Sequence, residues 1–245
     1  MITSIKNETI KDIMKLKQKK YRDDKGLFLV EGYHLVEEAR KAQCIQKIIT
    51  TLDNAFEEET IYVSKSVMEK LAFTKTPQPI MAICKKTKHN EILKNGQRYL
   101  LLDRVQDPGN VGTILRTALA FQYDQIIMSN DCVDIYNDKV LRSTQGAIFQ
   151  INICYMELKD AIVFLQNQGV EIYGTCLQNA KSIEKYEKKE KMAFVMGNEG
   201  QGVSQEILDL CHHLLYIPIK AIESLNVAIA SAITMYHFQR KEDER

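Results

Sequence analysis

Three short segments of the chain combine glycine with polar side chains that could bind a substrate or a cofactor. They are residues 107–116, 197–202 and 217–226. Each follows an apolar stretch and precedes a helical pattern, so each is expected to join a strand to a helix. In a parallel sheet such loops meet at the carboxyl ends of the strands, where ligands bind. The three segments therefore predict one composite site.

The first segment has the composition of a turn followed by a helix start. Pro108 and Gly109 suit a type II turn, and Asn110 is expected to cap the next helix. Arg116 falls outside the apolar stripe of that helix, one turn beyond Gly112. An arginine one turn into a helix can help to bind a phosphate at the helix N-terminus. An ordinary capped helix with an exposed arginine would look the same, so this motif alone is only suggestive.

The second and third segments add glycines, a carboxylate and an amide. The glycine spacing, Gly-x-x-Gly-x-Gly, comes late in the chain. A dinucleotide site needs Gly-x-Gly-x-x-Gly after an early strand, which disfavours a nucleotide-dependent oxidoreductase. A tight turn would explain Gly202 but not Glu199. Ser224 is the expected helix cap, and Asn226 is a poor helix former whose amide is expected to bond elsewhere, unless it is simply exposed.

Composition indicates a folded chain with little net charge. The 245 residues are 45% hydrophobic and carry a formal charge of +1, enough for one large domain or a small and a medium one. Residues 1–25 hold eight Lys or Arg against four acids. This basic stretch could face phosphates, although by itself it fits an ordinary solvated helix face better.

Cysteine usage and hydropathy exclude several classes of protein. The six cysteines form no Cys-x-x-Cys pair, and several lie in apolar stretches, so we expect reduced, buried thiols and no metal site. No apolar run approaches the ~20 residues of a membrane span, and no signal-like segment begins the chain. We therefore expect a soluble, cytoplasmic protein without a membrane partner.

The periodicity divides the chain into two α/β blocks. In residues 1–90 we expect helices at 9–16, 33–42 and 64–71 and strands at 27–30, 47–51, 61–63 and 80–84, which together suggest a small α/β sandwich. Polar residues 85–97 are the expected linker. In residues 98–245 we expect strands at 99–102, 125–128, 151–155, 170–174, 193–196 and 214–217, and helices at 111–121, 138–147, 158–168, 204–211 and 224–240. Near-continuous apolar strands between helices predict a parallel sheet covered on both faces, and the charged residues 181–191 are expected to be a mobile loop.

Taken in order, the three segments resemble the SpoU (TrmH-type) family of RNA ribose 2'-O-methyltransferases. The family patterns Asn-x-Gly-x-x-x-Arg-Thr, Gly-x-Glu-x-x-Gly and Ile-Pro-Ile with Ser-Leu-Asn match residues 110–117, 197–202, and 217–219 with 224–226. Residues 142–147 also look like the family's intermediate helix. The chain departs from the pattern at Ala221, where relatives usually carry glycine.

The resemblance implies a SPOUT-type fold with a C-terminal trefoil knot, S-adenosylmethionine as cofactor and a homodimer. The N-terminal block resembles a substrate-binding domain related to ribosomal RNA-binding proteins, most recognisably at residues 28–32, and members with that domain commonly modify large-subunit rRNA. The implied cofactor-binding residues are Thr175, Leu177, Gly197, Asn198, Gly202, Ile217, Ile219, Ser224, Leu225 and Asn226.

The resemblance also assigns roles to the polar residues. Arg116 would be catalytic, and because guanidinium does not deprotonate near neutral pH we expect it to clamp phosphate and ribose and to stabilise the developing alkoxide. Asn110, Glu199, Ser224 and Asn226 would position the reactants, with Glu199 as candidate proton acceptor. RNA phosphates are expected to contact Lys15, Lys17, Lys19, Lys20 and Arg22. The alternatives are a tRNA 2'-O-methyltransferase of the same fold and a non-catalytic RNA-binding protein.

Overall fold

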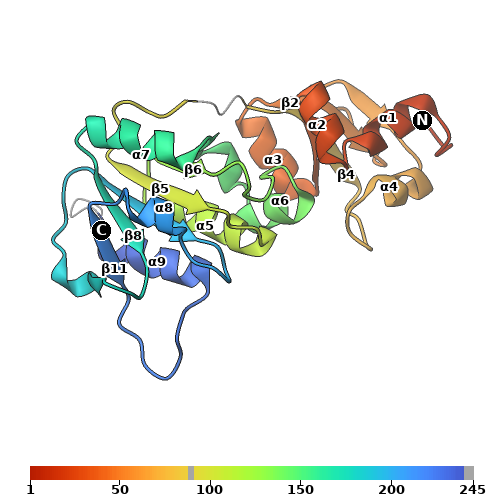
Figure 1. Ribbon diagram of the computed structural model, residues 1–245. Helices are drawn as coiled ribbons and strands as arrows, with labels where there is room; N and C mark the ends of the chain where they lie inside the picture. Colours follow the sequence, from red (N-terminus) through yellow and green to blue (C-terminus); the bar gives the residue numbers. More distant parts are fainter. Residues whose placement is uncertain (88–90, 240–245) are drawn as a thin grey trace. The chain divides into compact units, whose positions relative to one another are not determined.

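The computed structural model describes residues 1–87 and 91–239 (Figure 1). The chain forms two compact units, one from Met1–Lys88 with Asp134–Phe149 and the other from His89–Val133 with Gln150–Arg245. Three residues of the expected linker, 88–90, lie outside the described part, as does the end of the last expected helix at residue 240. In the described residues, no helix is both long and apolar enough to cross a membrane.

The first unit is built on a four-stranded sheet in the order β1-β4-β2-β3. Strand β4 pairs antiparallel with β1 and β2, and β2 pairs parallel with β3. Helices α1 and α4 bury their apolar faces in a common core with this sheet, as the predicted sandwich requires. Its elements are α1 (Glu8–Lys15), α2 (Lys19–Lys25), β1 (Leu27–Glu31), α3 (Tyr33–Lys41), β2 (Ile45–Thr50), β3 (Thr60–Tyr62), α4 (Lys65–Leu71), β4 (Ile80–Lys85), α6 (Asp138–Thr144) and the 3-10 helix η1 (Ala147–Phe149).

The segment Asp134–Phe149 packs within the first unit, although it follows β6 in the chain. The Phe28 and Tyr136 ring centroids are 4.5 Å apart. Gly146 has φ +88°, and a Cβ there would come within 2.6 Å of the Glu38 side chain. Glycine is thus needed both for the backbone conformation and for the close approach to α3.

The basic stretch contains a helix that periodicity did not predict, α2, and one of its cations is buried. Arg22 is only 5% exposed and forms an ion pair with Asp134 at 2.6 Å. Its guanidinium also donates to the carbonyls of Leu16 and Lys17. The prediction that Arg22 contacts RNA is therefore wrong, because its donors are used inside the unit and phosphate cannot reach them.

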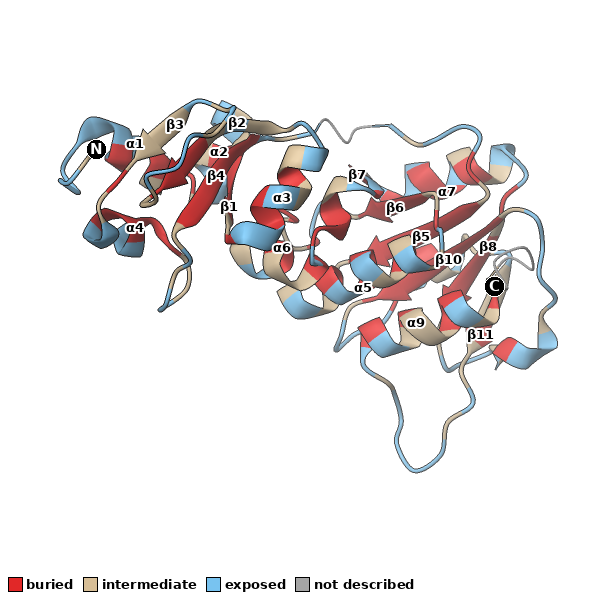
Figure 2. Ribbon diagram, turned by 180° about the vertical axis from the view of Figure 1, so that it is seen from behind, coloured by how far each residue is buried: buried red, intermediate tan, exposed pale blue. Residues whose placement is uncertain are grey.

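The second unit is a seven-stranded parallel sheet in the order β7-β6-β5-β10-β8-β11-β9. Helices α7 and α8 bury their apolar side chains against one face. Helices α5 and α9 pack together on the other face, opposite α7 (Figure 2). The predicted parallel sheet covered on both faces is confirmed. Its elements are β5 (Arg98–Asp103), α5 (Pro108–Ala120), β6 (Gln125–Met128), β7 (Asn152–Tyr155), α7 (Leu158–Asn167), β8 (Glu171–Thr175), β9 (Lys181–Ser182), the 3-10 helix η2 (Ile183–Lys185), β10 (Met192–Gly197), α8 (Gln205–Leu208), β11 (His213–Tyr216) and α9 (Val227–His237).

The charged segment after β8 is more ordered than its composition suggested. Lys181 and Ser182 form β9 beside β11, and Ile183 is buried. The Tyr186 hydroxyl donates to the Leu214 carbonyl at 2.9 Å. The segment expected to be a loop thus contains a short strand and a 3-10 helix, and Ile183 and Tyr186 pack it against the sheet.

Candidate functional site

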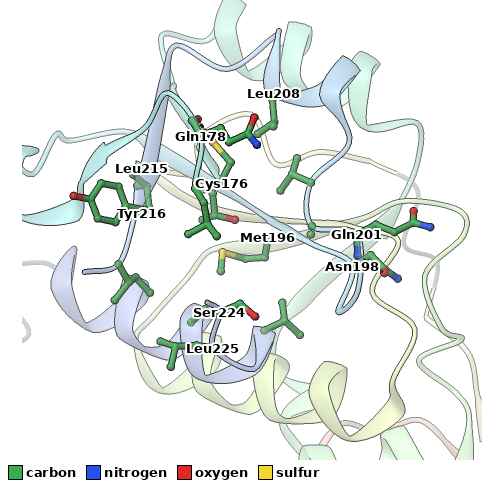
Figure 3. Close-up of a pocket in the computed structure, with 18 of the residues that line it drawn as sticks. Cys176, Gln178, Met196, Asn198, Gln201, Leu208, Leu215, Tyr216, Ser224 and Leu225 are labelled. Carbon is green, nitrogen blue, oxygen red and sulfur yellow. Dashed lines mark hydrogen bonds between the residues drawn. The ribbon is translucent and has the colours of Figure 1, made fainter. Parts of the chain in front are cut away.

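A cavity of about 520 Å³ lies where β8, β10 and β11 end (Figure 3). Its walls come from residues 175–179 at the end of β8, residues 196–203 around the glycine-rich loop, and residues 214–217, 219 and 223–225 before α9. Gln205, Leu208, Val227 and Ala230 complete the lining. All the predicted cofactor-binding residues line it except Asn226. Asn226 lies between the lining residues Leu225 and Val227 and caps helix α9.

Helix α5 begins earlier than predicted. The Asp107 side chain caps the helix, because its Oδ1 accepts a hydrogen bond from the backbone N–H of Asn110 at 2.8 Å. Pro108 lies in the first turn. The predictions of a type II turn at Pro108-Gly109 and of Asn110 as cap were therefore wrong. Proline tolerates this position because a first-turn amide has no partner inside the helix. Since Asp107 is the cap, the Asn110 side chain is free to bond elsewhere.

Helix α9 is capped by Asn226 and not by Ser224 as predicted. The Asn226 Oδ1 accepts from the amides of Ala228 and Ile229, at 2.9 and 3.3 Å. Its Nδ2 donates to Asn110 Oδ1 at 2.9 Å. The expected remote partner of the Asn226 amide is thus confirmed, and the start of α9 is tied to the start of α5.

Glu199 continues this link into the glycine-rich loop. Its Oε1 accepts from Asn110 Nδ2 and from the Asp107 amide, both at 3.0 Å, and its Oε2 lies 3.4 Å from the Gln106 amide. Burial acts to raise the pKa of Glu199, but the Asn110 bond and the backbone amides outweigh it and hold the pKa below its ordinary value. A carboxylate with bonded oxygens and a lowered pKa is a weak base, which disfavours Glu199 as the proton acceptor.

The glycine-rich loop folds back on its own strand. Asn198 and Gly202 exchange two backbone hydrogen bonds, of 3.1 and 2.9 Å, and Gly202 has φ +69°. A Cβ on Gly197 would lie 2.0 Å from the backbone of Gly202 and of Val203. No side chain fits at Gly197, so this glycine is needed for the loop to close.

Arg104 is a site residue that sequence patterns did not identify. It has φ +56° although it is not glycine, and its Nε donates to Asp103 Oδ1 at 2.9 Å. A terminal nitrogen of its guanidinium donates to Gln201 Oε1 at 3.0 Å, while its carbonyl accepts from Asn198 Nδ2 at 2.8 Å. Arg104 therefore connects the end of β5 to the glycine-rich loop. Its only sequence signal was a charged residue at a strand end.

Arg116 stands apart from this network. It is exposed on α5 and is not among the cavity residues, and its side chain forms no hydrogen bond or ion pair with the residues that the structure describes. Its guanidinium is thus available to a partner outside the chain.

The lysines of the basic stretch differ among themselves. Lys15 pairs with Asp12 at 2.7 Å and Lys19 with Asp23 at 2.6 Å. Lys17 donates to the Ala72 carbonyl at 2.7 Å and lies over the Phe73 ring. Lys20 is exposed and forms no ion pair within residues 1–87 and 91–239.

Comparison with known proteins shows to which family the chain with these three loops is similar. Residues 97–236 match the model of the SpoU rRNA Methylase family, and residues 7–82 match the MRM3-like substrate binding domain. The chain belongs to the SpoU rRNA methylase family. The resemblance stated from the loop motifs is thereby confirmed, as is an RNA methyltransferase as the class of enzyme.

Relatives match over nearly the whole chain. The 23S rRNA (guanosine(2553)-2'-O)-methyltransferase RlmP of Bacillus subtilis is 39% identical, over 97% of this chain and 98% of its own. The AdoMet-bound rRNA methyltransferase from Sinorhizobium meliloti is 30% identical, with a TM-score of 0.89 over 96% of this chain and 95% of its own. A putative TrmH-family RNA methyltransferase from Porphyromonas gingivalis is also 30% identical, with a TM-score of 0.86 over 97% of this chain and 100% of its own.

Proposed function

We propose that this SpoU-family protein methylates a ribose 2'-hydroxyl of RNA, in 23S rRNA, with S-adenosylmethionine as methyl donor. The observation that carries the proposal is the hydrogen-bonded link Asn226–Asn110–Glu199, which joins three loops beside one cavity. The name of the Bacillus subtilis relative supports the 2'-O position and the rRNA substrate.

The residues that line the cavity fit such a cofactor. Its volume of about 520 Å³ lies in the usual range for small-molecule sites, and the side-chain-free Gly197 leaves backbone groups at its wall. We propose that Thr175, Leu177, Gly197, Asn198, Gly202, Ile217, Ile219, Ser224 and Leu225 hold the cofactor. When bound, S-adenosylmethionine supplies an electrophilic methyl group on a sulfonium. The chain itself must orient the nucleophile and exclude water.

Arg116 is proposed to act on the ribose and phosphate of the target nucleotide. Its guanidinium stays protonated, so it would stabilise the developing alkoxide and would not remove the proton. Asn110, Glu199 and Asn226 are proposed to fix the loops that present the cofactor and the nucleotide. Ser224 lines the cavity near Asn226 and would contact the cofactor directly.

We propose residues 1–90 as an RNA substrate-binding domain and residues 98–245 as the methyltransferase domain, although Asp134–Phe149 of the latter range packs within the first unit. Lys20 is the strongest phosphate contact, because Lys15 and Lys19 are partly neutralised by neighbouring acids. Lys17 could reach RNA only by giving up its bonds to backbone carbonyls.

We further propose a homodimer that acts in the cytoplasm, with the C-terminal segment threaded as a trefoil knot. Helix α9 exposes Ile229 and Tyr236, at 50% and 64%, which supports an apolar contact with a second copy. Sedimentation velocity at micromolar concentration tests the dimer. A monomer that still binds the cofactor would refute it.

Methyl transfer is tested with purified protein, tritiated S-adenosylmethionine and separate 23S rRNA and tRNA substrates. We expect label in 23S rRNA, at a nucleotide that becomes resistant to alkaline cleavage because its 2'-hydroxyl is blocked. Label in tRNA alone would overturn the rRNA assignment. Binding of RNA without any transfer would overturn the enzymatic one.

A further inference from the structure

The charged side chains that line the cavity are both acidic. Glu199 and Glu223 are the charged residues among the described residues that line it, and no lysine, arginine or histidine belongs to the lining. The remaining polar side chains there are neutral amides and hydroxyls. An occupant of the cavity therefore lies in a negative electrostatic field.

Two cations lie near the cavity but outside its lining. Arg104 reaches the lining residue Gln201, but its guanidinium is held by the carboxylate of Asp103, so the pair is close to neutral. Lys220 belongs to the third loop and is exposed, but it is not among the residues that line the cavity.

The two glutamates differ in what they can offer an occupant. Both oxygens of Glu199 accept hydrogen bonds from the protein. Glu223 is exposed at the cavity, and its carboxylate forms no hydrogen bond or ion pair with any other residue of the described ranges. Glu223 is thus the carboxylate that remains free to interact with a bound molecule.

We propose that Glu223 makes the cavity prefer a positively charged cofactor, so that S-adenosylmethionine binds more tightly than its demethylated product. The inference rests on the proposed function. Transfer breaks the carbon–sulfur bond, whose electron pair stays on sulfur, and forms a carbon–oxygen bond while the ribose proton leaves to solvent. The sulfonium becomes a neutral thioether, and the ligand loses one positive charge inside the same cavity.

This loss of charge would favour exchange of product for fresh cofactor. A carboxylate attracts the sulfonium form but has no matching interaction with the thioether, so only the substrate form gains from Glu223. Because Glu223 is exposed, the gain should be that of a surface ion pair, a factor of about two to five in affinity.

Calorimetric titration of the full-length protein tests the proposal with three ligands. They are S-adenosylmethionine, S-adenosylhomocysteine, and an analogue that carries an ammonium group in place of the sulfonium. In Glu223→Gln we expect the two cationic ligands to bind about two- to fivefold more weakly and the neutral product to bind as before. In the wild type, higher salt should reduce the preference for the cationic ligands.

Glu187→Gln is the matched control, because Glu187 is an exposed acid of the same unit that does not line the cavity. It removes the same charge and should leave all three affinities unchanged.

Equal weakening of all three ligands in Glu223→Gln would overturn the proposal and indicate an effect on loop shape. Unchanged binding of all three would overturn it as well. If the wild type bound neither cofactor nor product, the proposed function itself would fail.

Discussion

The hydrogen bonds of the Asn226–Asn110–Glu199 link and the ion pairs of the exposed lysines Lys15 and Lys19 join residues at very different sequence distances. In the site, Asn226 bonds Asn110 and Asn110 bonds Glu199, so each hydrogen bond joins segments about a hundred residues apart. In the basic stretch, Lys15 and Lys19 pair with acids three or four residues away on the same helix.

The difference shows what each kind of bond can do. A hydrogen bond between segments far apart in the sequence holds one loop against another. When one partner is removed, the other partner loses that hydrogen bond and has no substitute for it. A local pair on an exposed helix is worth roughly 0.2–1 kcal/mol and neutralises charge that RNA would otherwise meet. We therefore expect substitutions in the site to have large effects and those in the basic stretch to have graded ones.

The largest effect is expected from Arg116→Ala. Loss of one donor to a developing oxyanion typically lowers turnover by about 100- to 1000-fold. Arg116 is exposed and lies outside the cavity, so folding and cofactor affinity should be unchanged. Single-turnover methylation measures the turnover, and calorimetry measures the cofactor affinity. Arg116→Lys should also fail, because an ammonium group cannot replace a planar fork of donors.

The control for Arg116 is Thr113→Ala, an exposed position one turn earlier on α5. It should keep most of the activity. Near-wild-type turnover in Arg116→Ala would show that the chemistry depends on the loop network alone.

Gly197→Ala and Gly200→Ala should show that two glycines of one loop differ in how well they tolerate a side chain. A Cβ at Gly197 would meet backbone atoms at 2.0 Å, whereas at Gly200 the nearest atom is 3.7 Å away. Overpacking of this kind costs about 1–3 kcal/mol or more when the backbone cannot move. We expect Gly197→Ala to lower the melting temperature and cofactor affinity, and Gly200→Ala to leave the melting temperature unchanged. Similar behaviour of the two variants would mean that the loop rearranges easily.

Asn110→Ala and Asn226→Ala should lower activity non-additively. Asn110→Ala removes a hydrogen bond to a carboxylate, worth about 1.5–3 kcal/mol, and Asn226→Ala also removes a helix cap worth about 0.5–2 kcal/mol. Because the two amides bond each other, the double variant should lose less than the two single losses together, with a coupling of about 0.5–3 kcal/mol in kcat/KM. Strict additivity would show that the loops are positioned independently.

The sequence predicted the sheet of the second unit well and the starts of its helices poorly. Strands such as β5 and β10 are continuous apolar runs, and burial on both faces requires that pattern. Asp107 and Asn110 are both good caps, however, and so are Ser224 and Asn226. In the structure the Asn110 side chain bonds Glu199 and Asn226 and does not cap, and no local pattern contains those bonds.

Tertiary contacts also explain what the charge pattern missed. Arg22 looks like one more cation of a basic stretch, but its partner Asp134 lies more than a hundred residues away. The same applies to the segment Asp134–Phe149, whose place in the first unit depends on contacts such as that of Tyr136 with Phe28. Arg104 acts through Asn198 and Gln201, and nothing in its neighbouring residues indicates this.

In the basic stretch, Lys20→Gln should weaken RNA binding more than Lys15→Gln. Each lost phosphate contact lowers the slope of log affinity against log salt by about 0.7–0.9, and Lys20 has no acid partner in the described ranges to neutralise it. Lys17→Gln should instead lower thermal stability, since Lys17 bonds two carbonyls of the α4 end. Filter binding over a salt series measures the slopes. Unchanged slopes in all three variants would mean that the stretch is only a solvated helix face.

The smallest effect is expected at Ala221, where the resemblance to the family pattern predicted a glycine. Ala221 has φ +71°, a left-handed conformation that costs an L-residue roughly 1–2 kcal/mol. Ala221→Gly relieves that strain but gives the unfolded chain more freedom, so the gain in unfolding free energy should be at most about 1 kcal/mol. Chemical denaturation measures this gain, and Ala120→Gly in the exposed last turn of α5 is the control that should only destabilise.

Because the loop also carries Ile219 and Ser224 at the cavity, the glycine should loosen the loop and weaken cofactor binding slightly. A fall in stability in Ala221→Gly would show that the alanine conformation carries no strain, and that the third loop is held by its contacts and not by its backbone.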